Sequence, residues 1–213
     1  IIPCGSGNGL ARHLGIPMDP IGALNFQLER PAYLADVMYA SDRLFVNIAG
    51  IGFDGSVAAA FNTGGKRGLL NYIRLIVSGY FKSKEFTCKL LGPDFNYDGP
   101  AFIVAFANGS QYGNNARIAS GAREDDGKME VVIVRKPALW QVLRFTWQVM
   151  TGSIRNSGLV TFHRTTVLNA EISRAVDLHL DGEAAGQVMT LDLRVEPGKL
   201  KLARTTIRDT ETP

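Results

Sequence analysis

A glycine-rich turn near the start of the chain has the residue types that bind phosphate. The turn follows an apolar pair typical of a strand end, precedes a helix predicted over residues 9–14, and consists of Gly5, Ser6, Gly7 and Asn8. Backbone N–H groups and the positive end of a helix dipole point at an anion in such a turn, and Ser6 adds a hydroxyl donor. The turn is no Walker A loop, which needs GK[ST], and no Rossmann loop, which needs Gly or Ala where Leu10 stands. Contact with a phosphate is the expectation.

Acidic residues beside Asp-Gly pairs could supply the carboxylates of a phosphotransferase. The chain has four such pairs: Asp54-Gly55, Asp98-Gly99, Asp126-Gly127 and Asp181-Gly182. Asp-Gly is the favoured two-residue hairpin turn, so turn chemistry alone accounts for each pair. Residues 123–128 place three carboxylates next to a turn, where side-chain and backbone oxygens could hold Mg²⁺. Asp181 and Glu183 flank a glycine after a predicted strand and could place a general base beside a phosphate.

A second glycine-rich segment, residues 50–55, matches the GxGxxG pattern of dinucleotide-binding proteins. It lies between a predicted strand and a predicted helix, as that pattern requires. The acidic residue that should follow about 20 positions later is missing, because no Asp or Glu stands between Gly55 and Lys84. Glycines that shape a tight strand-to-helix connection are the simpler interpretation.

The same acid-free window predicts a basic helix over residues 68–81 with aromatic residues at its end. Its cations could meet anionic head groups while its rings lie at a membrane interface. A core helix with charged ends is an equally good interpretation. The sequence contains no apolar run of the ~18 residues that a membrane span needs.

Charge and the spacing of cysteines and histidines argue against a nucleic-acid-binding protein, a disulfide scaffold and a local metal motif. The 213 residues include 23 Lys and Arg against 20 Asp and Glu, so the net charge of +3 gives no reason to expect a nucleic-acid partner. The two cysteines have neither disulfide-scaffold nor metal-site spacing, which favours a reducing cytoplasm. The three histidines stand too far apart for a local metal motif and are expected to be surface or packing residues.

The predicted elements change character along the chain. Helices are expected over residues 9–14, 19–30, 56–62, 68–81 and 137–150, and strands over 33–39, 44–49, 86–91, 101–107, 129–135, 161–172, 176–180, 189–195 and 200–203. This order predicts an α+β protein: the tail of an α/β nucleotide-binding domain (residues 1–30), an antiparallel β-sandwich domain with a few helices (31–204) and a tail (205–213).

Read together, four segments resemble the diacylglycerol kinase and sphingosine kinase-like lipid kinases. Residues 3–12 (PCGSGNGLAR) are similar to the family's P-x-G-[ST]-x-N-x-x-A-R segment, and residues 47–54 (NIAGIGFD) to its N-x-x-G-I-G-F-D segment. Residues 108–122 are similar to its N-x-x-x-x-G stretch, with Ser120 in place of the usual Pro, and residues 180–183 (LDGE) to its late D-G-E. The four segments occur in the family's order over nearly the whole chain.

The resemblance implies transfer of the ATP γ-phosphate to a lipid hydroxyl, in a cleft between a nucleotide domain and a β-sandwich. Gly5, Ser6, Gly7 and Asn8 would contact the nucleotide phosphates. Asp126 would bind Mg²⁺, helped by the carbonyls of Arg123 and Lys128. Glu183 would be the general base, and Asp181 beside it would act as a base or as a metal ligand. A lipid substrate, transient contact with a membrane surface, peripheral cytoplasmic location and a possible homodimer are also expected.

One departure from the family concerns the start of the chain. The family's G-G-D-G-T nucleotide signature lies upstream of the P-x-G-[ST] segment, where this sequence begins. The chain is therefore expected to be a C-terminal fragment that is inactive alone. Two other functions remain open: a non-catalytic lipid-binding β-sandwich whose acidic turns are structural, and an NAD kinase-like enzyme.

Overall fold

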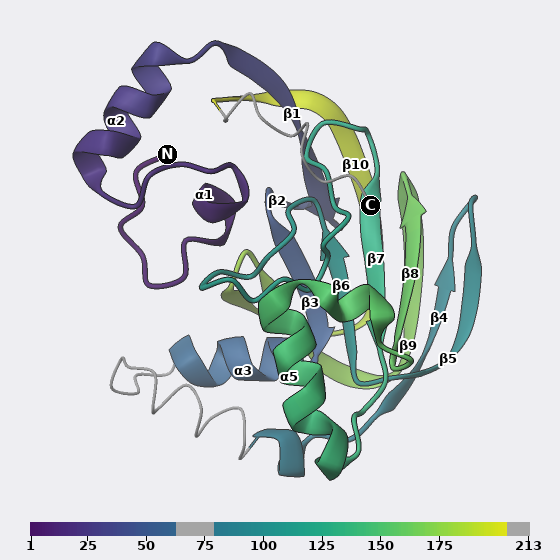
Figure 1. The fold of residues 1–213 in the computed structure, drawn as a ribbon. Coiled ribbons are helices and arrows are strands. Elements are labelled where there is room, and N and C mark those ends of the chain that lie inside the picture. The colour runs from purple at the N-terminus through teal and green to yellow at the C-terminus, as the bar shows by residue number, and fades with distance from the viewer. Residues whose placement is uncertain (63–78, 204–213) are drawn as a thin grey trace.

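Strands dominate the fold after residue 31 in the computed structural model, which describes residues 1–62 and 79–203. Two helices come first, and three-residue to 21-residue strands follow with a few helical segments between them (Figure 1). The elements are α1 Gly9–His13, α2 Pro20–Glu29, β1 Ala32–Ala40, β2 Arg43–Phe45, β3 Ile48–Gly52, α3 Phe53–Asn62, β4 Phe86–Leu91, β5 Asn96–Ala101, β6 Ile103–Ala107, β7 Met129–Val134, η1 Leu139–Gln141, α5 Val142–Thr151, η2 Ser153–Asn156, β8 Val160–Thr165, β9 Val167–Leu180 and β10 Glu183–Ala203.

The strands pair antiparallel in the order β2-β1-β10-β9-β3-β6-β7-β8, and β4 pairs with both β5 and β9. The long strand β9 joins the layers, because residues 169–172 pair with β4 and residues 178–180 pair with β3. The apolar core between the layers includes Phe45, Ile51, Leu90, Phe106 and Leu168. The predicted antiparallel β-sandwich with a few helices is confirmed.

A second apolar cluster covers the other face of β6 and β7. Every residue of these two strands is buried, which matches their continuous apolar sequences. Ile118 of the loop after β6 and Ile154 of η2 pack on this face. Phe145 and Val149 of α5 pack against the same cluster, so the opposite face of α5 is exposed.

The N-terminal helices pack on the far ends of β1 and β10 through a third cluster that includes Leu14, Phe26 and Leu202. A buried polar group fixes this contact: Glu124 accepts hydrogen bonds from His13 Nε2 at 2.7 Å and from the Tyr33 hydroxyl at 2.7 Å. Burial alone would raise the pKa of Glu124. The hydrogen bond and charge of His13 and the hydrogen bond from Tyr33 together outweigh this effect and hold the pKa well below its ordinary value. The division into residues 1–30 and 31–204 stays a prediction.

Several predicted elements differ from the observed ones in their bounds. The strand expected over residues 44–49 divides into β2 and β3, because the backbone N–H groups of residues 46–48 turn toward a side chain instead of a neighbouring strand. The strands expected over 101–107 and 161–172 also divide, whereas those expected over 189–195 and 200–203 are parts of β10. Most of the predicted helix over 68–81 lies outside the described residues; residues 79–82 are helical.

Candidate active site

The β9–β10 turn is held in place by the side chain of its first residue. Asp181 and Gly182 have φ values of 51° and 89°, the left-handed pair expected of a two-residue hairpin turn, so this predicted turn is confirmed. The Asp181 carboxylate accepts hydrogen bonds from the backbone N–H groups of Val46 at 2.9 Å, Asn47 at 2.8 Å and Ile48 at 3.1 Å. These contacts tie the turn to the β2–β3 connection and give Asp181 a positioning role.

The other Asp-Gly pairs do not form hairpin turns of this kind. Asp54 and Gly55 lie in the first turn of α3, and Asp98 and Gly99 lie inside β5. Only Gly127 of the pair at 126 and 127 has a positive φ, at 70°. The predicted turns at Asp54 and Asp98 are therefore wrong. The backbone at Asp54 belongs to the start of α3, and the backbone at Asp98 belongs to the β4–β5 ladder.

A buried histidine lies directly beneath the β9–β10 turn. His179 is 2% exposed; its Nδ1 accepts from the Gly182 N–H at 3.3 Å, and its Nε2 lies 3.2 Å from Asp54 Oδ2. Because a backbone N–H can only donate, Nδ1 is the acceptor and Nε2–H donates to the carboxylate. The Tyr112 hydroxyl donates to the same Asp54 oxygen at 2.8 Å. We call Asp54, Tyr112 and His179 the Asp54 cluster.

The Asp54 cluster explains the second glycine-rich segment. A Cβ at Gly50 would lie 2.7 Å from His179 Nε2 and would also overlap the Asp54 carboxylate. Gly52 ends β3 and α3 begins at the next residue, which confirms that these glycines shape a strand-to-helix connection. Sequence reasoning expected His179 only as a packing or surface residue. The one available signal was its place near the end of a predicted strand, two residues before the Asp181-Gly182 pair.

The glycine turn at the start of the chain is closed by its own asparagine. Asn8 donates to the Gly5 carbonyl at 2.8 Å and accepts from the Gly5 N–H at 3.0 Å, while Gly5 and Ser6 are exposed. The helix that follows, α1, is only five residues long. Its dipole contributes less at the turn than a longer helix would.

The glycine turn lies on the loop that carries Tyr112. Asn8 forms an isolated bridge with Gly113, and the Gly7 carbonyl accepts from the Asn114 N–H at 3.3 Å. A Cβ at Gly9 would lie 2.6 Å from the Tyr112 carbonyl, so this approach requires glycine. One loop therefore links the first glycine turn to the β9–β10 turn. Its residues Gly113 and Asn114 contact the glycine turn, and the hydroxyl of the adjacent Tyr112 donates to Asp54.

The acidic segment 123–128 does not join this cluster. Asp126 pairs with Arg164 of β8 and accepts from the Lys128 N–H at 3.1 Å, whereas Arg123 pairs with Asp125 at 3.3 Å. Arg164 lies next to the start of the 14-residue strand β9, whereas His179 and the β9–β10 turn lie at the far end of that strand. The part of the chain that the structure describes contains no group of three His, Cys, Asp or Glu side chains placed to hold a metal ion. The magnesium site expected at Asp126 and the carbonyls of Arg123 and Lys128 stays a prediction, and we derive no step through it.

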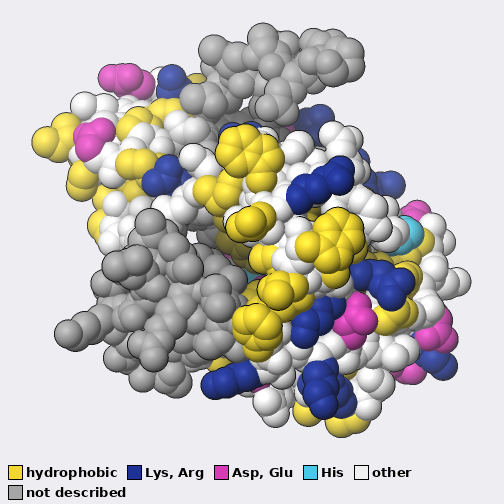
Figure 2. All heavy atoms as spheres, turned by 60° about the horizontal axis from the view of Figure 1, so that its bottom comes forward, with side chains coloured by type: hydrophobic (Ala, Val, Ile, Leu, Met, Phe, Trp, Pro, Cys, Tyr) yellow, Lys and Arg dark blue, Asp and Glu magenta, His cyan; other side chains and the backbone are white. Residues whose placement is uncertain are grey.

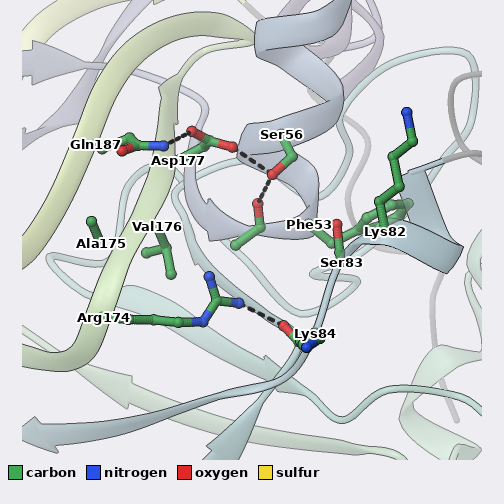
Figure 3. Close-up of a pocket in the computed structure, with 11 residues that line it drawn as sticks. Phe53, Ser56, Lys82, Ser83, Lys84, Arg174, Ala175, Val176, Asp177 and Gln187 are labelled. Carbon is green, nitrogen blue, oxygen red and sulfur yellow. Dashed lines mark hydrogen bonds between the residues drawn. The ribbon is translucent and has the colours of Figure 1, made fainter.

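A pocket of about 340 Å³ opens beside the Asp54 cluster, between the start of α3 and β9 (Figure 3). Inside it, Asp177 accepts from the Ser56 hydroxyl at 2.6 Å and from the Gln187 amide at 2.9 Å. Its basic lining residues are Lys82, Lys84 and Arg174. Sequence reasoning missed this pocket, because its residues come from four separate segments.

Comparison with known proteins gives this geometry a context. Residues 47–204 match the model of a family described as "YegS C-terminal NAD kinase beta sandwich-like domain". Two relatives described as "Probable lipid kinase YegS-like" come from Pseudomonas fluorescens Pf-5 and Chromohalobacter salexigens. The first is 28% identical over 95% of this chain and 67% of its own length, and the second is 30% identical over 86% and 60%.

Solved structures show the same fold. A structure described as a diacylglycerol kinase from Bacillus anthracis strain Sterne has a TM-score of 0.72 and 17% identity, covering 97% of this chain and 66% of that one. A second one from that strain, with a TM-score of 0.76 and 20% identity, covers 97% and 68%. The chain spans about two thirds of the length of these relatives. By the domain that matches residues 47–204, the chain belongs to the YegS-like family, to which relatives described as probable lipid kinases are similar, and it shares its fold with the diacylglycerol kinase structures.

Proposed function

We propose that this chain is the acceptor side of a kinase that transfers the γ-phosphate of ATP to the hydroxyl of a lipid such as diacylglycerol or a sphingoid base. The observation that carries the proposal is the contact path from the first glycine turn through Tyr112 and Asp54 to the β9–β10 turn. The four segments that resemble lipid kinases are spread over residues 3–183, yet they surround one cluster.

Glu183 is the general base in this proposal. It is the first residue of β10, is exposed, and follows directly on a turn that Asp181 and His179 fix in place. A lipid alcohol is a poor nucleophile, so its proton passes to the Glu183 carboxylate as the alcohol oxygen attacks the γ-phosphorus, and ADP leaves with the electrons of the broken P–O bond. The Asp181 carboxylate is engaged by three N–H groups, which favours positioning over proton transfer.

The glycine turn contacts the donor phosphates in this proposal. Asn8 holds the turn closed through the Gly5 backbone, and Ser6 is exposed, so the donors of Ser6 can face an anion without rearrangement. A divalent cation such as Mg²⁺ accompanies the phosphates of ATP in kinases generally.

The experiment compares acceptors in one phosphorylation assay. The complete gene product and the 213-residue chain are incubated with ATP and either diacylglycerol, sphingosine or NAD⁺. We expect a phosphorylated lipid from the complete gene product only. Formation of NADP⁺ would favour the NAD kinase-like alternative that the family description suggests, and no product with any acceptor would favour a lipid-binding sandwich without catalysis.

A further inference from the structure

Five large apolar side chains project from η1 and α5 away from the protein. They are Leu139, Trp140, Leu143, Trp147 and Met150, with 46% to 82% of their surface exposed, and we call them the α5 stripe. The last four are spaced by three, four and three residues, which places them on one face of the helix. Figure 2 shows yellow side chains gathered on this face of the molecule, with Lys and Arg around them. A contiguous exposed apolar patch of this kind indicates an interaction surface.

The charge around the α5 stripe has one sign along the sequence. No Asp or Glu occurs from residue 135 to residue 170, whereas five cations do: Arg135, Lys136, Arg144, Arg155 and Arg164. Arg135, Arg155 and Arg164 pair with acids from elsewhere in the chain, whereas Arg144 is exposed within the stripe's own helix. The face is therefore apolar with a basic rim.

A neighbouring segment extends this face. The Tyr80 hydroxyl donates to the Pro137 carbonyl at 2.6 Å, which ties residues 79–82 to the start of η1. Phe81 is 64% exposed and Lys82 is exposed beside it. Aromatic side chains next to cations occur here on two separate segments.

We propose that the α5 stripe is a membrane-docking surface that inserts its tryptophans into the interface of an anionic bilayer. Tryptophan prefers the boundary between head groups and acyl chains, and a basic rim is attracted to anionic lipids. The proposal rests on the proposed function, because a lipid substrate lies in a bilayer. No helix among the described residues is long and apolar enough to cross a membrane.

Other occupants fit the face less well. A second copy related by two-fold symmetry would bring the same cations of both chains together at the contact, which is repulsive. Helix α2 lies at the opposite end of the molecule from α5 (Figure 1). A membrane with anionic lipids is the partner whose charge complements the rim.

The docking surface is connected to the candidate site. The backbone N–H of Arg117 donates to the Val149 carbonyl of α5 at 2.9 Å, and the loop that contains Arg117 also carries Tyr112 of the Asp54 cluster. A membrane-bound α5 would therefore hold this loop, and the cluster on it, at a defined place relative to the bilayer.

Binding is measured with vesicles of phosphatidylcholine, with and without phosphatidylglycerol. The chain has only two tryptophans, both in the stripe, so intrinsic fluorescence reports this face alone. We expect a blue shift and co-sedimentation with anionic vesicles. L143Q/W147Q keeps Trp140 as a reporter and should weaken binding about tenfold or more, since each buried side chain of this size contributes that much. R144Q should weaken binding to anionic vesicles only.

The matched control is I21Q/L28Q, which removes two equally exposed apolar side chains from α2 and should leave vesicle binding unchanged. The proposal is overturned if L143Q/W147Q binds vesicles like the parent, if the chain self-associates through the stripe in sedimentation velocity, or if acrylamide fails to quench the tryptophans of the complete gene product. Phosphorylation of a short-chain, water-soluble lipid separates the two proposals, because it needs the β9–β10 turn but not the stripe.

Discussion

His179 and Asp181 fix the same turn from two directions, one from beneath through the Gly182 N–H and one through the backbone of the β2–β3 connection. The contact of Asp181 with the β2–β3 connection and that of His179 with Asp54 cannot be found from the sequence near the turn, because their partners are more than 120 residues away. The Asp-Gly pair itself was predictable, since its φ values follow from residue type. A buried polar residue such as His179 reveals itself only when its tertiary partner is known.

Replacing Asp54 by alanine should lower the free energy of unfolding by about 1–3 kcal/mol, because the buried His179 and the half-buried Tyr112 lose their acceptor. Urea unfolding measures the loss. Asp42→Ala, at an exposed turn between β1 and β2, is the matched control and should cost less than about 0.5 kcal/mol. Equal stability of the two variants would show that the Asp54 cluster is not satisfied in the way described.

Glu124 should make stability depend on pH. Its folded pKa lies below its ordinary value of 4.5, so its contribution is complete above that pH and is lost as the pH falls through it toward the folded value. Glu124→Gln removes this titration. Unfolding by urea over a pH series should show the parent exceeding the variant in stability most at neutral pH, with the gap closing in acid. A gap that stays constant would refute the assignment.

At the scale of elements, the second glycine-rich segment lets strand β3 approach β9 closely enough for His179 to reach Asp54. The strand, the connection and the helix after it were predictable from glycine spacing and apolar pattern. The division of residues 44–49 into two strands was not, because it depends on three backbone donors that turn to Asp181. Local patterns predict which elements form, and a distant side chain decides where one of them ends.

Gly50→Ala should destabilise the protein by about 1–3 kcal/mol through overpacking, because its Cβ would push against His179 and the Asp54 carboxylate. Gly158→Ala is the matched control, since a Cβ there meets nothing within 4 Å. It should stay within about 1 kcal/mol of the parent. Thermal or urea unfolding of both variants decides; a harmless Gly50→Ala would contradict the close packing of β3 on β9.

At the scale of the whole molecule, the β-sandwich separates the two thiols. Cys88 faces the core between the layers, and burial, with a smaller effect of Asp98, raises its pKa to about 12, while Cys4 is exposed. A thiol reagent at neutral pH should therefore modify one cysteine per chain quickly and the second only after unfolding. Fast reaction of both thiols in the native protein would contradict the burial of Cys88 on the core-facing side of β4.

The overall class of the fold followed from the sequence, because short β-type segments between turn residues are typical of a sandwich. The way β9 pairs with β4 at one end and β3 at the other could not be predicted, since strand partners depend on the whole arrangement. The same limit applied to Asp126: its ion pair with Arg164, 38 residues later, could not be predicted from the sequence around it.

The most direct test concerns Glu183 in the complete gene product. Phosphate transfer from ATP to the lipid that proves to be its acceptor is measured for the parent, for Glu183→Gln and for Glu171→Gln, an exposed carboxylate on β9 away from the turn. We predict that Glu183→Gln lowers kcat by about 100-fold or more, while its thermal stability and that of the control match the parent. A Glu183→Gln protein that is folded and turns over at the parent's rate would contradict the account.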